Sequence, residues 1–174
     1  MIDFEPSNAF DQASSHNIVL YHGSYKNEVV KNPMIKESKW SKDFNQGFYC
    51  TNIKHQAIKW SIRFTDGVVS LYNYYVNKSL NMLCFNEMTE EWLDFIIQCR
   101  SGQPHSYDIV EGPMADDQIY DAIKLLLSGC MSRIAFWDIA RFRYPKHQIG
   151  FQTSKALKTL DYLDHLEVKK NDYI

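Results

Sequence analysis

The sequence predicts a single α+β domain, and three observations support this fold class. The chain has 174 residues, a length at which one continuous hydrophobic core can form. Hydrophobic residues make up 45% and charged residues 23% of the chain, which is close to the composition of globular proteins. Strand-like and helix-like segments follow one another without regular alternation, which favours α+β over a doubly wound parallel sheet.

We expect the domain at residues 17–166, preceded by a polar lead-in at residues 1–16 and followed by a short tail at residues 167–174. No internal repeat, Pro/Gly-rich linker or charge block marks a further boundary. One core and one functional site are therefore expected.

The first elements of the domain are a strand and a long loop. The apolar, β-branched run 18–21 predicts a buried strand that ends at His22 and Gly23. Residues 24–46 are polar and irregular, and loops of this length are usually functional. We therefore expect this loop to cross and cover part of the surface.

A second strand and a helix follow the loop. Gly47 introduces the strand 48–51, and Asn52 offers an N-cap for the helix behind it. Apolar residues then recur at helical spacing, which predicts that Trp60 lies on the inward face of the helix. These positions are Ile53, Ala57, Trp60 and Phe64.

The middle of the chain predicts two neighbouring strands and a helix. Residues 68–76 alternate in the manner of a strand, and residues 80–85 are expected to pair beside it. Thr89 as a capping residue, two acidic residues in the first turn and Gly102 as a stop signal predict a helix at residues 89–100.

Two strands and three helices are expected in the C-terminal part. Residues 107–110 predict a strand, after which Asp116 or Asp117 caps a helix that ends at Gly129. A helix at residues 132–142 precedes the last predicted strand, 148–152. Thr153 then caps a final helix, whose inward residues are Ala156, Leu157, Leu160 and Leu163.

Composition limits the classes of partner and the location. The formal net charge of −2 provides no basic field that would attract nucleic acid or an anionic membrane. No apolar run approaches the ~20 residues of a membrane-spanning helix. The N-terminus lacks the features of a secretion signal, and the four cysteines show no paired short spacing. We expect a cytoplasmic protein without a metal site, since the histidines and cysteines lack ligand spacings.

Considered singly, the candidate site residues have structural explanations. A histidine at the end of a strand, such as His22, is more often a hydrogen-bonded structural residue than a functional one. Tyr49 and Trp60 would be core aromatic residues, and Asp116 and Asp117 would be helix-capping acids.

In combination, these residues resemble the ADP-ribosyltransferase superfamily, in its poly(ADP-ribose) polymerase and diphtheria-toxin-like branch. In that branch a strand-end His-Gly is followed by a Gly-x-Tyr strand and then by a helix with a second aromatic residue. Here the corresponding segments are YHGS at residues 21–24, GFYCT at residues 47–51 and the helix that contains Trp60. Trp60 follows Tyr49 at the interval that the branch shows.

The run from Leu20 to Leu163 also resembles a bacterial domain-of-unknown-function family, number thirty-nine ninety, through YHGS, DFNQGFYCT, EWLDFI, DIVEGPMADD and QIGFQT. Its members are regarded as ADP-ribosyltransferase-like and often occur beside small partner proteins in suspected toxin–antitoxin pairs. The resemblance implies split antiparallel sheets with flanking helices, NAD as substrate, and an antitoxin protein as a partner.

The chemistry of NAD gives each residue type a role. Nicotinamide in NAD is a flat cation, so the rings of Tyr49 and Trp60 could hold it by stacking and cation–π attraction. The carboxamide needs one donor and one acceptor, and the backbone of Gly23 offers both without a side chain in the way. The resemblance implies that His22 binds a ribose hydroxyl, and Ser24 could reach the nicotinamide amide.

The sequence departs from the superfamily at the strand that usually presents a catalytic glutamate. This strand has no acid, and Gln148 takes the position. A glutamine can hydrogen-bond the ribose 2′-OH, but it carries no charge and is no general base. Asp116 or Asp117 could supply the missing carboxylate, and Asp43 in the covering loop is a weaker candidate. Gln148→Glu is then expected to preserve or raise NAD cleavage.

Three functions fit these residues. The first is transfer of ADP-ribose from NAD to a macromolecular acceptor, protein or nucleic acid, by the toxin of a bacterial toxin–antitoxin pair. The second is an NAD glycohydrolase, which passes the same ribosyl group to water. The third is a catalytically degenerate module that only binds NAD, which the missing glutamate favours.

Overall fold

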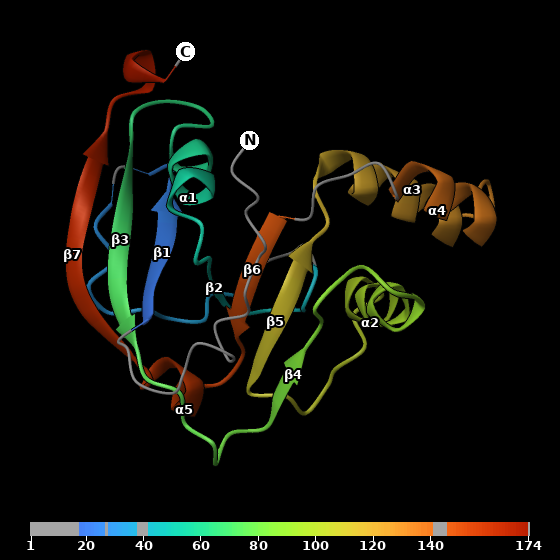
Figure 1. Ribbon diagram of the computed structural model, residues 1–174, viewed down its shortest axis with the longest axis horizontal. Coiled ribbons are helices and arrows are strands. Elements are labelled where there is room, and N and C mark those ends of the chain that lie inside the picture. Colours follow the sequence, from blue (N-terminus) through green and yellow to red (C-terminus); the bar gives the residue numbers. More distant parts are fainter. Residues whose placement is uncertain (1–17, 27, 38–41, 141–145, 174) are drawn as a thin grey trace.

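Two β-sheets, one of three strands and one of four, form the centre of the structure (Figure 1). This computed structural model describes residues 18–26, 28–37, 42–140 and 146–173. The lead-in expected at residues 1–16 lies outside the described residues. With helices flanking the sheets, the observed fold class is α+β, as the sequence predicts.

The three-stranded sheet has the order β1-β3-β7, and both pairings are antiparallel. Helix α1 packs against β1 and β3 through a small core of its own. The elements of this half are β1 (Ile18–Ser24), α1 (Lys54–Ser61), β3 (Gly67–Tyr74), β7 (Leu160–Val168) and the short 3-10 helix η1 (Lys170–Asp172). Strand β7 passes the expected end of the domain at residue 166, since Val168 is buried against α1.

The four-stranded sheet has the order β2-β6-β5-β4. Its pairings are antiparallel except for β4 and β5, which run parallel. Figure 1 shows α2, α3 and α4 on the far side of this sheet from the three-stranded sheet. The elements are β2 (Phe48–Cys50), β4 (Met82–Cys84), α2 (Glu90–Arg100), β5 (Ile109–Met114), α3 (Asp117–Leu127), α4 (Arg133–Ala140), β6 (Lys146–Phe151) and α5 (Ser154–Leu157).

Two large hydrophobic clusters lie on opposite faces of the four-stranded sheet. The first joins the two sheets and includes Leu20, Tyr72 and Ile149. The second lies between the four-stranded sheet and the helices, around Phe44, Trp92 and Ile119. Within the described part of the chain, no helix is long and apolar enough to cross a membrane.

Capping signals predicted two helices correctly. In α2 the Trp92 N–H donates to Thr89 Oγ1 at 3.2 Å, and Gly102 has the left-handed φ of 77° that ends the helix. In α3 the Ile119 N–H donates to Asp116 Oδ1 at 3.2 Å, and Gly129 has a φ of 74°. Both helices therefore depend on local hydrogen bonds that the sequence displays.

Three expectations about the elements were wrong. Residues 80–85 do not pair beside β3, because β4 lies in the other sheet, parallel to β5. The final helix is only the four residues of α5, and Leu160 begins β7. Leu163 is therefore an exposed strand residue and not an inward helical one. Asn52 is not the N-cap of α1, because Ile53 takes that position and makes no side-chain cap.

Helix α1 also has a different inward face from the one predicted. The buried residues are Ala57, Ile58 and Ser61, whereas the Trp60 side chain is 45% exposed and Phe64 points to solvent as well. Small residues face the sheet because the Ala57 carbonyl lies where a side chain on Gly23 would be. This close approach rotates the helix so that the larger rings point outward.

Candidate functional site

The predicted site residues of the first half of the chain meet where β1 and β2 separate. Tyr21 and Thr51 join the two strands by two backbone hydrogen bonds of 2.9 Å. One residue further along β1, a side chain makes the link between the two strands: the His22 Nδ1–H donates to the Tyr49 carbonyl at 2.7 Å. We call this place the fork, defined by Tyr21, His22, Gly23 and Tyr49.

Gly23 presents its backbone to the fork. In a strand, the N–H and C=O of residues i and i+2 point to the same side. Tyr21 uses both groups toward β2, so the N–H and C=O of Gly23 point the same way, beyond the last hydrogen bond with Thr51. Ser24 follows as the last residue of β1, opposite Val68. The fork therefore offers a backbone donor and acceptor side by side.

His22 is held as a neutral ring with one free acceptor position. A carbonyl can only accept, so the bond to Tyr49 fixes the proton on Nδ1 and leaves Nε2 as an acceptor. Burial lowers the pKa of His22, and the nearby Lys42 and Lys36 act in the same direction. The ring stacks on Phe48 with centroids 4.3 Å apart, which fixes its orientation.

The lowered pKa of His22 predicts a pH dependence of stability. Because the folded ring takes up a proton less readily than the unfolded one, the free energy of unfolding should fall as pH drops below about 6.5. His22→Gln should remove this part of the pH dependence, measured by urea unfolding at about pH 5 and about pH 7.5. His55→Gln, at an exposed position of α1, is the control. If the free energy of unfolding changed equally between these two pH values in His22→Gln and in the wild type, the prediction would be contradicted.

Tyr49 and Gln148 lie on one face of the four-stranded sheet. Tyr49 on β2 is opposite Gly150 on β6, and Gln148 lies two residues from Gly150, so both side chains point to the same side. A Cβ at Gly150 would lie 2.5 Å from Gln152 Nε2 and 3.2 Å from Tyr49 Cε1, so a larger residue there would require these side chains to shift. The Tyr49 hydroxyl donates to the Asn45 carbonyl at 2.7 Å and accepts from the Phe44 N–H at 3.2 Å. Burial raises the pKa of Tyr49, which keeps the hydroxyl neutral.

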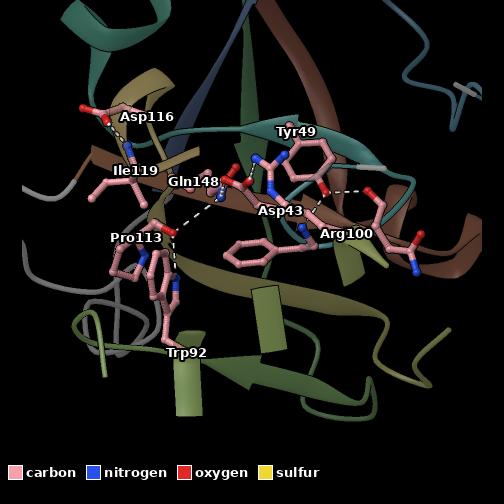
Figure 2. Close-up of polar contacts among 11 residues, drawn as sticks. Asp43, Tyr49, Trp92, Arg100, Pro113, Asp116, Ile119 and Gln148 are labelled. Atoms are coloured by element: carbon pink, nitrogen blue, oxygen red, sulfur yellow. Dashed lines mark hydrogen bonds and ion pairs between the residues drawn. The ribbon is translucent and has the colours of Figure 1, made fainter. Parts of the chain in front are cut away.

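The carboxylate nearest to Gln148 belongs to Asp43 in the covering loop (Figure 2). Asp43 is 5% exposed and forms an ion pair with Arg100 of α2. Its Oδ2 accepts from the Ala115 N–H at 2.9 Å and from Gln148 Nε2 at 2.8 Å. Sequence spacing gave Asp43 only a weak argument, and it gave no signal for Arg100 or Ala115.

The acids of the GPMADD segment have other roles. Asp116 is the N-cap of α3, and its Oδ2 accepts from Lys146 Nζ at 3.4 Å. Burial raises the pKa of Asp116, but the Ile119 N–H and the Lys146 ammonium outweigh this effect and lower it overall. Asp117 is exposed and pairs with Arg63 at 3.3 Å. Asp116 therefore has the predicted capping role, whereas Asp117 is the first residue of α3 and makes an exposed ion pair.

The rings of Tyr49 and Trp60 each have a different neighbour. Tyr49 stacks on Phe44 with centroids 6.4 Å apart, and Lys42 Nζ lies 4.8 Å from its ring centroid. The Trp60 ring faces outward, with the Arg63 guanidinium 5.3 Å from its centroid. Among the described residues the two rings do not contact each other, and the predicted nicotinamide slot between them stays a prediction.

A buried Glu111–His147 pair lies on the opposite face of the sheet from Gln148. His147 Nε2 and Glu111 Oε1 are 2.7 Å apart, and both residues are almost fully buried. The Gln56 side chain binds the backbone of His147 through both its amide oxygen, at 3.0 Å, and its nitrogen, at 2.6 Å. These bonds tie the start of α1 to β6, so we assign the pair a structural role.

A cavity of about 660 Å³ lies elsewhere on the surface. Its walls are segment 31–35 of the covering loop and residues of α5 and β7, and they include none of the predicted site residues. Across the described ranges, no group of three or more His, Cys, Asp or Glu side chains is placed to hold a metal ion.

Comparison with known protein families finds one match. Residues 18–162 match the family described as Protein of unknown function (DUF3990). The chain belongs to this family. The DUF3990 region begins at the first residue of β1 and ends within β7, so it contains every predicted site residue. Comparisons with curated proteins and with solved structures find no match to this DUF3990 protein.

Proposed function

We propose that the protein binds NAD at the fork and transfers its ADP-ribose to a macromolecular acceptor. The observation that carries this proposal is the hydrogen bond from His22 Nδ1 to the Tyr49 carbonyl. It brings the two separated motifs together and leaves His22 Nε2 as an acceptor one residue from the Gly23 backbone. The resemblance of the YHGS and GFYCT segments to ADP-ribosyltransferases supports the same function.

Each group at the fork suits one part of NAD. The N–H and C=O of Gly23 match the acceptor and donor of the nicotinamide carboxamide, with Ser24 adjacent. His22 Nε2 can accept a hydrogen bond from a ribose hydroxyl. The Tyr49 ring already has the Lys42 ammonium over it, which is the kind of contact that a cationic nicotinamide would make. Lys42 Nζ also donates to the Gly47 carbonyl at 3.3 Å, so a nicotinamide on this ring would have to displace the ammonium.

The proposed reaction breaks the bond between the ribose and the nicotinamide nitrogen. The bonding electrons leave with nicotinamide, which becomes neutral, and the ribose gains oxocarbenium character. An acceptor nucleophile then bonds to the same carbon and loses its proton. We propose that Gln148 accepts a hydrogen bond from the ribose 2′-OH, and that the fixed negative charge for this region is Asp43 and not Asp116 or Asp117.

Two experiments test this function. Calorimetric titration with NAD should show binding that is lost in His22→Ala. Incubation of the protein with labelled NAD and bacterial lysate should transfer the label to a macromolecule, and digestion with protease or nuclease identifies its class. Absence of NAD binding by the folded wild-type chain would refute the proposal.

Two alternative functions would use the same residues at the fork. Release of nicotinamide without transfer of label would indicate an NAD glycohydrolase. Binding of NAD without release would indicate a catalytically degenerate module, which the uncharged Gln148 favours over the usual glutamate. The products of one incubation distinguish all three functions.

A toxin–antitoxin context is part of the same proposal. We propose that the protein acts in the cytoplasm, where NAD is available, and that a small antitoxin protein neutralises it. Expression of the chain alone should then arrest growth, while co-expression with the product of an adjacent gene should restore it. If a His22→Ala variant still arrested growth, the arrest would not depend on NAD binding at the fork.

Trp60→Ala should weaken NAD binding with little loss of stability. The ring is 45% exposed, so its removal leaves no cavity in the core. If the ring stacks on nicotinamide, the loss is about 0.5–2 kcal/mol, or roughly 2- to 30-fold in Kd by calorimetry. Phe64→Ala, an exposed ring just beyond the same helix, is the control and should bind NAD normally. Equal affinities of Trp60→Ala and the wild type would exclude Trp60 from the site.

A further inference from the structure

The Gln148 side chain is held by two acceptors at its amide nitrogen. Nε2 donates to Asp43 Oδ2 at 2.8 Å and lies 3.5 Å from the Pro113 carbonyl oxygen. Neither partner can donate to an amide oxygen, so the orientation of the amide is determined. Among the described residues, no protein donor reaches the oxygen, Oε1. Gln148 therefore directs its nitrogen inward and keeps its oxygen available as an acceptor.

The acceptor that holds Gln148 is itself fixed. Arg100 pairs with Asp43 Oδ1, while Oδ2 receives the Ala115 N–H and the Gln148 amide. The next residue, Phe44, is fully buried in the cluster between the sheet and α2. This part of the loop belongs to the core and is not a removable cover. Asp43 is thus a permanent neighbour of Gln148.

We propose that Asp43, held by Arg100, is a positioning residue that orients the Gln148 amide so that Oε1 faces the ribose 2′-OH of NAD. The role of the oxygen rests on the proposed function, whereas the orientation of the amide does not. A carboxylate on the N–H side of an amide also draws positive charge to that side, which makes the oxygen a stronger acceptor. An uncharged residue thereby gains part of what the usual glutamate supplies.

Asp43→Asn tests the orientation without changing the shape of the side chain. Asparagine has one carbonyl oxygen, and the charged Arg100 makes the stronger hydrogen bond to it. The asparagine NH₂ then faces Gln148, whose amide must rotate to offer Oε1. Hydrogen exchange of the Gln148 side-chain amide protons, assigned by their absence in Gln148→Ala, should change from protected to fast. The kcat for NAD cleavage should fall about tenfold or more, with KM changed less than about threefold.

Arg100→Met in the Asp43→Asn background should reverse both effects. Without the guanidinium, the asparagine oxygen returns to the Ala115 N–H and the Gln148 amide, and methionine can pack on the Tyr120 ring that Arg100 now covers at 4.1 Å. If Asp43 served only stability, the second substitution would remove one more contact, and amide protection and kcat would fall further instead of recovering. Thermal melts of each variant establish that it is folded.

The outcomes are distinct. Protected amide protons in Asp43→Asn, or fast exchange in a folded Asp43→Asn/Arg100→Met variant, would overturn the orientation. If Asp43→Asn does not fold, the double variant alone decides this. A wild-type chain that binds no NAD would refute the proposed function and with it the role of Oε1, while the exchange rates still establish or overturn the orientation.

Discussion

Asp43→Ala should lower the free energy of unfolding by about 3–5 kcal/mol, since it leaves a mostly buried guanidinium without its carboxylate. The side chains of Asp43 and Arg100 are 6% and 14% exposed, so water cannot replace the lost partner fully. The Ala115 N–H and the Gln148 amide lose their acceptor as well. For a chain of this length we expect a decrease in Tm of roughly 10 °C, measured by calorimetry or circular dichroism.

Asp117→Ala is the matched control. It also removes an aspartate from an ion pair with arginine, but the side chains of Asp117 and Arg63 are 83% and 43% exposed. Exposed pairs contribute at most about 1 kcal/mol, so the melting temperature should change little. A similar loss of stability in both variants would mean that the buried contacts of Asp43 stabilise the fold no more than an exposed ion pair does.

Elements with local signals could be predicted from the sequence. Thr89 and Asp116 cap their helices, and Gly102 and Gly129 end them, with donors and acceptors only a few residues apart. The strand predicted at residues 18–21 is also present, as β1, although it continues through His22 and Gly23 to Ser24. Such interactions depend on neighbouring residues alone, so the pattern in the sequence contains them.

Elements defined by distant partners could not be predicted in this way. The apolar spacing in α1 fitted an inward Trp60, but contact with Gly23 and Gly67 selects the smaller Ala57 and Ser61. Strand β4 pairs with β5 and not with the preceding β3, which no local pattern indicates. The run from Leu160 becomes a strand because β3 has a free edge for it.

The candidate site divides in the same way. His22, Tyr49 and Gln148 could be proposed because they belong to the sequence motifs that carry the resemblance, each within a strand. Their surroundings could not, because Asp43 meets Arg100 and Gln148 across 57 and 105 residues of sequence. A single charged residue in an irregular loop has no periodicity that would reveal a buried partner. The structure therefore adds a buried carboxylate beside Gln148, that of Asp43.

Gln148→Ala should reduce NAD turnover about 100-fold while NAD affinity stays within about threefold of the wild type. The reason is that a hydrogen bond to the ribose hydroxyl strengthens as positive charge develops in the transition state. Single-turnover release of nicotinamide and calorimetry measure the two quantities separately. Asp116→Ala is the control, and it should cost about 1 kcal/mol of stability as a lost helix cap with normal turnover. If Gln148→Ala turns over normally while Asp116→Ala or Asp117→Ala is inactive, the catalytic carboxylate lies in the GPMADD segment.

Gln148→Glu is now expected to lower turnover, although the sequence alone favours the opposite. The new carboxylate would place an oxygen where Nε2 now donates, against Asp43 Oδ2 at 2.8 Å and the Pro113 carbonyl oxygen at 3.5 Å. The introduced carboxylate and Asp43 repel each other, so the pKa of the new glutamate should rise and a larger fraction of it is protonated as pH falls. When the introduced glutamate is protonated, it donates to Asp43 and keeps its other oxygen as an acceptor, as glutamine does. Turnover by this variant should therefore increase as pH falls, and activity equal to the wild type at neutral pH would contradict the contact between Asp43 and Gln148.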